Sequence, residues 1–154
     1  MTRTARYQGA IIQNHHILLI KHHHHDDGSE YWVIPGGGRE PGETEEDCVQ
    51  REMKEETHLD VRIERLLLDV QINPGSAYRR KTYLCTPIAG EARPGNEPEP
   101  DAAQLYAISE VAWFDLRDEA AWDPLVVGLP ITYPQLQRIR AALGYSLDEN
   151  IQPG

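Results

Sequence analysis

Three glutamates at helical spacing are the residues most able to do chemistry in this chain. The segment Arg51–Glu56 reads REMKEE. On an α-helix each residue advances by about 100°, so Glu52, Glu55 and Glu56 would fall within an arc of roughly 100°. Like charges at this spacing destabilise an isolated helix by about 0.2–0.5 kcal/mol per pair. Such a carboxylate cluster favours a hard divalent cation, Mg²⁺ or Mn²⁺, whose preferred ligands are oxygens.

The simplest alternative for this cluster is a solvated helix face. Arg51 and Glu55, four residues apart, could form an i,i+4 ion pair of the kind found on exposed helices. A second signal precedes the glutamates, because Gly36, Gly37 and Gly38 form a run of three glycines. Glycines let a backbone adopt φ values that other residues resist, and they let it approach a metal or a phosphate closely. A plain turn would use them too, but the two signals together favour a metal site for phosphate chemistry.

The stretch from Gly37 to Leu59 resembles the Nudix box, the signature of Nudix hydrolases. That signature is G-x5-E-x7-R-E-U-x-E-E-x-G-U, where U is an aliphatic residue. The positions that match in register are Gly37, Glu43, Arg51, Glu52, Met53, Glu55, Glu56 and Leu59. His58 stands where the pattern has its last glycine. A motif with this many fixed positions is specific, and segments 31–38 and 111–116 extend the resemblance to about residues 5–145.

This resemblance implies a fold and a ligand set. The fold would belong to the α+β class, as the α/β/α Nudix sandwich, in which a mixed sheet is flanked by helices. We expect a single domain over residues 1–154. By the same resemblance, Glu52 and Glu56 would be metal ligands, and Glu55 would be a further ligand or the general base.

The remaining box residues are expected to support the glutamates. Arg51 joins the catalytic set as a residue that orients a carboxylate and reduces the mutual repulsion of its neighbours. Glu43 is placed to pair with Arg51, as its counterpart does in the family. Gly37 and Gly38 are expected to bring backbone against the substrate phosphates. His58 occupies a site that usually has left-handed φ, at a cost of about 1–2 kcal/mol for a non-glycine residue; we expect lower stability or an altered turn, not lost activity.

The implied reaction is hydrolysis of the pyrophosphate linkage of a nucleoside diphosphate joined to another moiety, with Mg²⁺ or Mn²⁺ as cofactor. ADP-ribose or a nucleotide sugar is favoured, since Pro74 lies near where proline recurs in ADP-ribose-type members. A nucleoside triphosphate or a dinucleoside polyphosphate stays open as the substrate. The general base would be one of the box glutamates or an acid from the loop region that follows. The candidates are Glu55, Glu56, Glu97, Glu99, Asp101 and Glu110.

A net charge of −10 bears on the partners. It argues against binding to a nucleic acid polymer, which needs a basic face. An anionic substrate would also need local positive charge, and the one compact basic run is Arg79-Arg80-Lys81. In a strand, Arg79 and Lys81 share a face while Arg80 points away. One of these faces is expected to contact substrate phosphate, and we assign Arg79 and Lys81 to that role. The alternative is solvent-facing charge that blunts an edge strand.

Two alternatives to an enzyme stay open. His58 in place of the box glycine motivates a non-catalytic, Nudix-like sensor of a nucleotide ligand. The run His22–His25 motivates a metal-binding protein that uses the box only as a scaffold. Four adjacent histidines cannot all converge on one ion from an extended backbone, so a polar hairpin loop near the rim of the site is the favoured interpretation of that run. Intact Glu52, Glu55 and Glu56 favour the enzyme.

The elements that must position these residues are short strands with few helices. Hydrophobic segments on either side of residues 13–16 indicate a hairpin, and 31–34 indicates a third strand. Thr44 can cap the box helix, with Val49 and Met53 as its buried edge at the rim of the core. Further strands are expected at 61–71, 78–87 and 105–116, an exposed loop at 90–101, and a closing helix at 133–143.

The overall composition indicates the class of protein and its location. Hydrophobic residues at 40% and charged residues at 26% are ordinary globular values. No apolar run approaches the roughly 20 residues needed to span a bilayer, and the N-terminal residues do not indicate a secretory signal. Cys48 and Cys85 are expected to be reduced core thiols. We therefore expect a cytoplasmic protein with no membrane association, and the resemblance suggests a homodimer.

Overall fold

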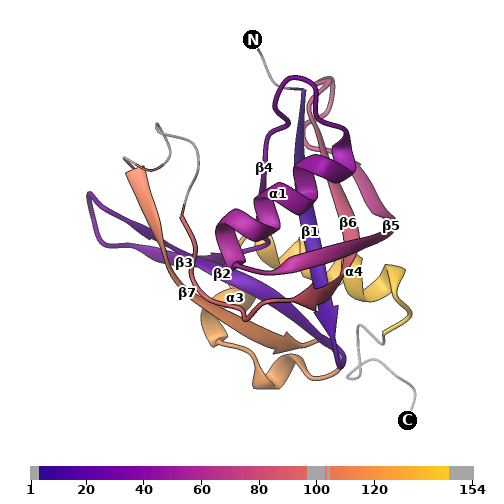
Figure 1. Cartoon of the computed structure of the whole chain (residues 1–154). Coiled ribbons are helices and arrows are strands. Elements are labelled where there is room, and N and C mark those ends of the chain that lie inside the picture. Colours follow the sequence, from indigo (N-terminus) through magenta and orange to yellow (C-terminus); the bar gives the residue numbers. More distant parts are fainter. Residues whose placement is uncertain (1–3, 97–102, 104, 146–154) are drawn as a thin grey trace.

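The computed structural model describes residues 4–96, 103 and 105–145 (Figure 1). Seven strands are present in this part of the chain: β1 (Ala5–Gln13), β2 (His16–His24), β3 (Glu30–Val33), β4 (Gly36–Gly37), β5 (Asp60–Gln71), β6 (Arg79–Ala89) and β7 (Tyr106–Asp115). Their main order is β3-β2-β1-β6-β5, with β4 beside β1 and β7 beside β2. The β1–β6 pairing is parallel and the others are antiparallel, so the sheet is mixed, as predicted.

Strand β1 is shared between two parts of this sheet. Its first residues pair with β4 and β6, whereas its last residues, Ile12 and Gln13, pair with β2. The hairpin between β1 and β2 is the one that the sequence predicts, with Asn14 at φ 51° and His15 at φ 66° in its two-residue turn. The two parts of the sheet diverge from β1 (Figure 1). The short strand β4 lies beside β1, near the place where they separate.

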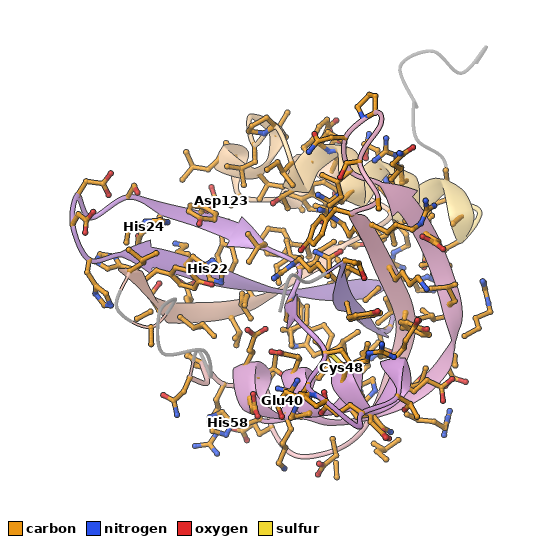
Figure 2. All side chains as sticks on the ribbon, turned by 90° about the horizontal axis from the view of Figure 1, so that it is seen from above. His22, His24, Glu40, Cys48, His58 and Asp123 are labelled. Carbon is orange, nitrogen blue, oxygen red and sulfur yellow. The ribbon has the colours of Figure 1, made fainter. Side chains whose placement is uncertain are left out.

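Helices cover both faces of the strands around β1. Helix α1 (Glu45–Thr57) lies on one face and α4 (Thr132–Ala142) on the other, and the two views agree on this arrangement (Figures 1 and 2). A short η1 turn (Glu119–Ala121) and α3 (Pro124–Val127) connect β7 to α4. Two buried clusters result, one that includes α1 residues and one that includes α4 residues. The expected α+β sandwich, with helices flanking a mixed sheet, is therefore confirmed.

Local sequence explains where α1 begins and which side it buries. Thr44 caps the helix by accepting a hydrogen bond from the Asp47 N–H (3.0 Å), and the Asp47 carboxylate returns to the Thr44 N–H. Val49 and Met53 are fully buried, and the Met53 side chain packs against Gly9 of β1. The predicted cap and buried edge of this helix are both confirmed.

His58 ends α1 in the left-handed conformation that was predicted, with φ 65° and ψ 11°. Its N–H donates to the Lys54 carbonyl (3.0 Å), and its ring contacts the Pro94 carbonyl (3.2 Å). We expect His58→Gly to raise the free energy of unfolding by about 0.5–1 kcal/mol, because removing the Cβ penalty outweighs the extra chain entropy of glycine. Urea denaturation would check this, and lower stability in the variant would show that the Pro94 contact dominates.

Two expectations about strands were wrong. Strand β6 lies between β1 and β5, so Arg79–Lys81 does not blunt a sheet edge. Residues His22 to His24 belong to β2, where they pair with β3 and β7, rather than to a hairpin loop. In both cases the pairing partner is distant in the sequence and local patterns did not reveal it. Within the described residues, no helix has the length and apolar character to cross a membrane.

Candidate active site

Two of the three glutamates are buried beneath the glycine strand. Glu52 and Glu56 are each 1% exposed, whereas the Glu55 side chain is 33% exposed. The Gly36 N–H donates to Glu56 Oε1 (2.9 Å). The sequence placed this carboxylate face at the rim of the core; instead the backbone of β4 covers two of its members. Glu55 is left as the carboxylate in contact with solvent.

Gly37 touches the Glu52 carboxylate so closely that no side chain would fit between them. A Cβ on Gly37 would overlap the carboxylate oxygens and lie 2.6 Å from Glu52 Cδ. Gly37 pairs with Tyr7 of β1, and this pairing holds β4 in place beside α1. The glycine run therefore allows a close approach between backbone and carboxylate. The predicted approach of this backbone to a metal or a phosphate stays a prediction.

This contact predicts the effect of a single methyl group. Gly37→Ala should lower kcat by on the order of 10²-fold, because displacing a reactive group by about 1 Å has effects of that size. Gly128→Ala is the matched control, since a Cβ there would meet only the Leu125 carbonyl at 3.8 Å. Steady-state rates and circular dichroism of both variants would check this. Equal activity of Gly37→Ala and wild type would show that the Glu52 position is not critical.

Arg51 organises the carboxylates around it. Its Nε and Nη2 donate to the two oxygens of Glu43 (2.6 and 3.0 Å), which is the pairing the sequence predicted. Its Nη1 donates to Glu52 (3.3 Å) and Glu55 (3.2 Å), and Nη2 also reaches the Gly38 carbonyl (3.1 Å). One guanidinium thus connects the glycine run to two of the three glutamates, Glu52 and Glu55.

The charges in this network shift one another's pKa. The hydrogen bonds to Glu43 raise the pKa of Arg51, with further contributions from the charges of Glu52 and Glu55. In turn, the Arg51 guanidinium lowers the pKa of Glu43. Arg51 therefore stays cationic and Glu43 anionic near neutral pH. Arg51 acts as a positioning residue here, since it holds carboxylates in place.

Residues 93–96, part of the loop predicted at 90–101, cover the end of α1, a contact that the sequence did not predict. The N–H groups of Arg93, Gly95 and Asn96 donate to the last helix carbonyls, those of Thr57, Glu56 and Glu55 respectively (3.0, 2.9 and 3.0 Å). Gly95 needs to be glycine, because its Cβ would overlap the Glu55 carbonyl oxygen. The sequence signal that could have predicted a turn at this point is Pro94-Gly95.

The acids proposed to complete the site divide into two groups. Glu97, Glu99 and Asp101 lie outside the described residues. Asn96, which precedes them, is bonded to the backbone of Glu55. Glu110 lies on β7, where it pairs with Lys21 of β2 (3.4 Å).

Each of the two basic residues assigned to substrate binding is paired with a carboxylate. Arg79 pairs with Asp69 on β5 (2.5 Å), and Lys81 pairs with Glu45 of α1 (2.9 Å). Tyr83 also donates to Glu45 (2.5 Å). Their role as substrate contacts stays a prediction, and a phosphate would have to exchange for these partners. Arg80 points to the opposite face, as the strand pattern predicted.

The histidine run does not form a metal site in the described part of the chain. His23 pairs with Glu30 (3.0 Å), His24 contacts the Tyr31 hydroxyl (2.9 Å), and His25 contacts the Ala103 carbonyl (3.3 Å). Across residues 4–96, 103 and 105–145, no three His, Cys, Asp or Glu side chains are gathered as they would be around an ion. In Figure 2 His22 and His24 lie on the β2–β3 hairpin, away from the residues labelled at α1.

His22 is a buried histidine held by aromatic rings. It is 5% exposed, stacks on Tyr106 (centroids 4.1 Å apart, 25°) and meets Tyr31 edge-on (5.5 Å). Burial, followed by the charges of Arg6 and His24, lowers the pKa of His22 from 6.5 to about 4. The native ring is therefore neutral at pH 5–7, whereas the unfolded chain gains a proton near pH 6.5.

This difference predicts a loss of stability on acidification. A lowered histidine pKa means that the unfolded state binds more protons between pH 6.5 and 4, so stability falls as the pH falls through that window. From pH 6.5 to 5.5 we expect a loss of about 1 kcal/mol. His22→Phe keeps the ring stack without titrating and should lack this component. Identical pH profiles of urea midpoints in both proteins would contradict the expectation.

The residues of the glutamate cluster fit a hard divalent cation by their chemistry. Glu52, Glu55 and Glu56 lie on adjacent turns of α1 and carry the oxygen donors that Mg²⁺ and Mn²⁺ prefer, although in this structure the three carboxylates are not gathered as they would be around one bound ion. The Gly37 backbone lies directly against one of them, Glu52, where other residues would intrude. Arg51 lies between Glu52 and Glu55 and offsets part of their charge.

Comparison with known proteins agrees with this geometry. The chain matches the NUDIX domain family over residues 3–127. A Caenorhabditis elegans nudix hydrolase is 38% identical over 89 residues, which cover 56% of this chain and 21% of that protein. The human 8-oxo-dGDP phosphatase NUDT18 is 36% identical over 83 residues, covering 54% of this chain and 23% of that protein. The chain thus matches less than a quarter of the length of each of these two relatives.

Solved structures extend the similarity to the fold. The crystal structure of an ADP-ribose pyrophosphatase from Streptococcus suis is 25% identical, with a TM-score of 0.63. The match covers 93% of this chain and 91% of that one. The fold described above is therefore shared along nearly the whole length of both chains.

Proposed function

This chain belongs to the Nudix hydrolase family, and we propose that it hydrolyses the pyrophosphate linkage of a nucleoside diphosphate joined to another moiety, with Mg²⁺ or Mn²⁺ as cofactor. The observation that carries the proposal is the burial of Glu52 and Glu56 against the backbone of Gly36 and Gly37. Burying two carboxylates is costly unless a cation or hydrogen bonds compensate them. A helix that needed only solubility would leave them in water.

Each residue of the cluster has a role in this proposal. Glu52 and Glu56 would hold the cation, and Glu55 would be either a further ligand or the general base. When bound, the cation would neutralise phosphate charge and acidify a water molecule. Glu55, the exposed carboxylate, is the favoured proton acceptor for the attacking water, with Glu56 as the alternative.

The remaining residues position substrate and carboxylates. Arg51 fixes Glu52 and Glu55 through Nη1 and is itself fixed by Glu43. Gly37 and Gly38 would present backbone to the substrate phosphates. Arg79 and Lys81 are retained as proposed phosphate contacts, conditional on exchange of their present ion pairs.

The substrate class rests on the relatives' names together with the chemistry of the site. The matched Streptococcus suis protein is named an ADP-ribose pyrophosphatase and the human relative an 8-oxo-dGDP phosphatase. Both names denote nucleoside diphosphate compounds. We propose ADP-ribose or a nucleotide sugar first, with nucleoside triphosphates and dinucleoside polyphosphates as further candidates. A cytoplasmic location and a homodimer stay predictions.

A substrate panel tests the proposal. ADP-ribose, nucleotide sugars, dinucleoside polyphosphates and nucleoside triphosphates would each be incubated with Mg²⁺, Mn²⁺ or EDTA, and released nucleotide and phosphate would be measured. Turnover of one class that EDTA abolishes supports the hydrolase. Tight binding of a nucleotide without turnover of any member would instead indicate a ligand sensor.

A further inference from the structure

Three arginines from three elements come together on the face of the sheet opposite α1. Arg6 on β1 and Arg80 on β6 are direct partners in the parallel register of these strands. With its amide oxygen toward Arg80, Gln135 of α4 accepts hydrogen bonds from Arg80 Nε (2.8 Å) and Nη1 (3.0 Å). Gln135 is buried, and Arg138 follows it by three residues on the same face of α4. We call Arg6, Arg80 and Arg138 the arginine cluster.

The arginine cluster has no carboxylate partner within the described residues. The Arg6 side chain makes one hydrogen bond there, a long one from Nη2 to the Ile34 carbonyl (3.5 Å). Of the eight other arginines in the described part of the chain, five pair with an Asp or Glu: Arg51, Arg62, Arg79, Arg117 and Arg140. With a net charge of −10 the chain has carboxylates in excess, so their absence from this cluster leaves concentrated positive charge.

Holding these cations together is unfavourable in the absence of an anion. Burial first, and then the charges of Arg6 and Arg138, lower the pKa of Arg80. Arg80 and Arg6 are both half-buried, so water screens their repulsion less than it would at an open surface. Guanidinium groups bind phosphate and carboxylate through paired hydrogen bonds, and a shared anion would remove the repulsion.

The cluster is connected to the glutamates through the segment that contains β4. The Arg6 side chain donates to the Ile34 carbonyl. Ile34 lies two residues before Gly36, and the Gly36 N–H donates to Glu56 Oε1. Residues 7 and 8 of β1, immediately after Arg6, pair with β4. Among the described strands β4 pairs with β1 alone. A ligand that passes its other edge could contact the glutamates with one group and the arginines with another.

We propose that the arginine cluster is a second anion-binding site, for a phosphate or carboxylate group that the substrate carries in addition to its scissile diphosphate. The assignment of this group to a substrate rests on the proposed function, whereas the existence of the anion-binding site does not. It narrows the substrate class to nucleoside diphosphate derivatives with a second anionic group. That group would be a phosphomonoester, a sugar carboxylate or an extended polyphosphate chain.

Binding of inorganic pyrophosphate in EDTA tests the site without catalysis. Removing metal leaves the glutamates repulsive to anions, and Arg79 and Lys81 are paired with Asp69 and Glu45. Calorimetry should therefore report mainly the arginine cluster, and the Arg80 and Arg138 variants identify its share. We expect saturable binding that weakens at least tenfold in Arg80→Gln and several-fold in Arg138→Gln. The Arg138 side chain is exposed, so we expect this second variant to fold like wild type. Arg62→Gln on β5 removes the same charge from a distant exposed pair and should leave the affinity within twofold. No saturable binding to wild type, or equal weakening in Arg62→Gln, would overturn the proposal.

Matched substrates then test the role of the site in catalysis and distinguish the sources of the anion. Three pairs of compounds are compared: ADP-ribose and ADP-ribose 2′-phosphate, UDP-glucose and UDP-glucuronic acid, and a dinucleoside diphosphate and a dinucleoside pentaphosphate. For one pair we expect a lower KM for the more anionic member, and Arg80→Gln should remove about tenfold of that preference with kcat little changed. Equal KM values within every pair would overturn the substrate role. If no compound is hydrolysed the proposed function fails, and the pyrophosphate titration still decides whether the anion site exists.

Discussion

Replacing Glu56 with glutamine is expected to lower kcat by about 10²–10⁴-fold while the chain stays folded. Glutamine keeps an oxygen that can accept the hydrogen bond from the Gly36 N–H, so the contact between α1 and β4 survives. What is lost is a negative charge that would hold the cation or accept a proton. The measurement is the rate on the best panel substrate across a Mg²⁺ titration, with circular dichroism to confirm the fold.

Glu46→Gln is the matched control for this variant. Glu46 lies in the first turn of the same helix and is exposed, so the same chemical change there should leave kcat within about twofold. If saturating Mg²⁺ restored the Glu56→Gln rate fully, Glu56 would act only in metal affinity. A rate equal to wild type at all Mg²⁺ concentrations would remove Glu56 from the catalytic set.

Replacing Arg51 with methionine is expected to lower the free energy of unfolding by about 3–5 kcal/mol. The change leaves the carboxylates of Glu43 and Glu52 without their guanidinium partner, and the Glu52 side chain is only 2% exposed. Methionine retains much of the aliphatic bulk of the side chain, so the loss reports charge and hydrogen bonding more than volume. Urea denaturation at pH 7 would measure it, and Arg51→Lys should recover only part, because lysine cannot reproduce the bidentate contact with Glu43.

The pH dependence separates an ion pair from simple packing. Arg51 lowers the pKa of Glu43 below its ordinary 4.5, so this contribution to stability is present above pH 4.5 and is lost as the pH falls through the native pKa. The difference in free energy of unfolding between wild type and Arg51→Met should therefore become smaller in acid. Arg62→Met, which breaks an exposed pair with Glu64, should change stability by no more than about 1 kcal/mol at any pH. A gap that stays constant down to pH 3 would assign the effect to packing.

Local signals predicted the box helix and its supports well. The Thr44 cap, the buried edge formed by Val49 and Met53, and the Glu43–Arg51 pair all depend on residues close in the sequence. The left-handed His58 could be predicted for the same reason, since the helix end alone determines that conformation.

The features that could not be predicted depend on strands that meet from distant parts of the chain. A cluster of glutamates looks like a solvated face until the β4 backbone is placed over Glu52 and Glu56. The run of histidines looks like a loop until β7 pairs with β2 and buries His22. Arg6 and Arg80 become neighbours only through the parallel β1–β6 register, which no periodicity in either segment indicates.

The shared position of β1 has a consequence for how the chain reaches its native state. During synthesis β1, β4 and α1 are complete well before β6, yet β1 gains its parallel neighbour only when β6 arrives. Pairings between distant segments form slowly, because the loop between them must close before any contact compensates for the lost entropy. Until then one edge of β1 is open to other chains, with the associated hazard of aggregation. The buried cluster beneath α1, which includes Tyr83 and Cys85 of β6, is therefore completed late, and substitutions at these two core positions can lower the yield of folded protein.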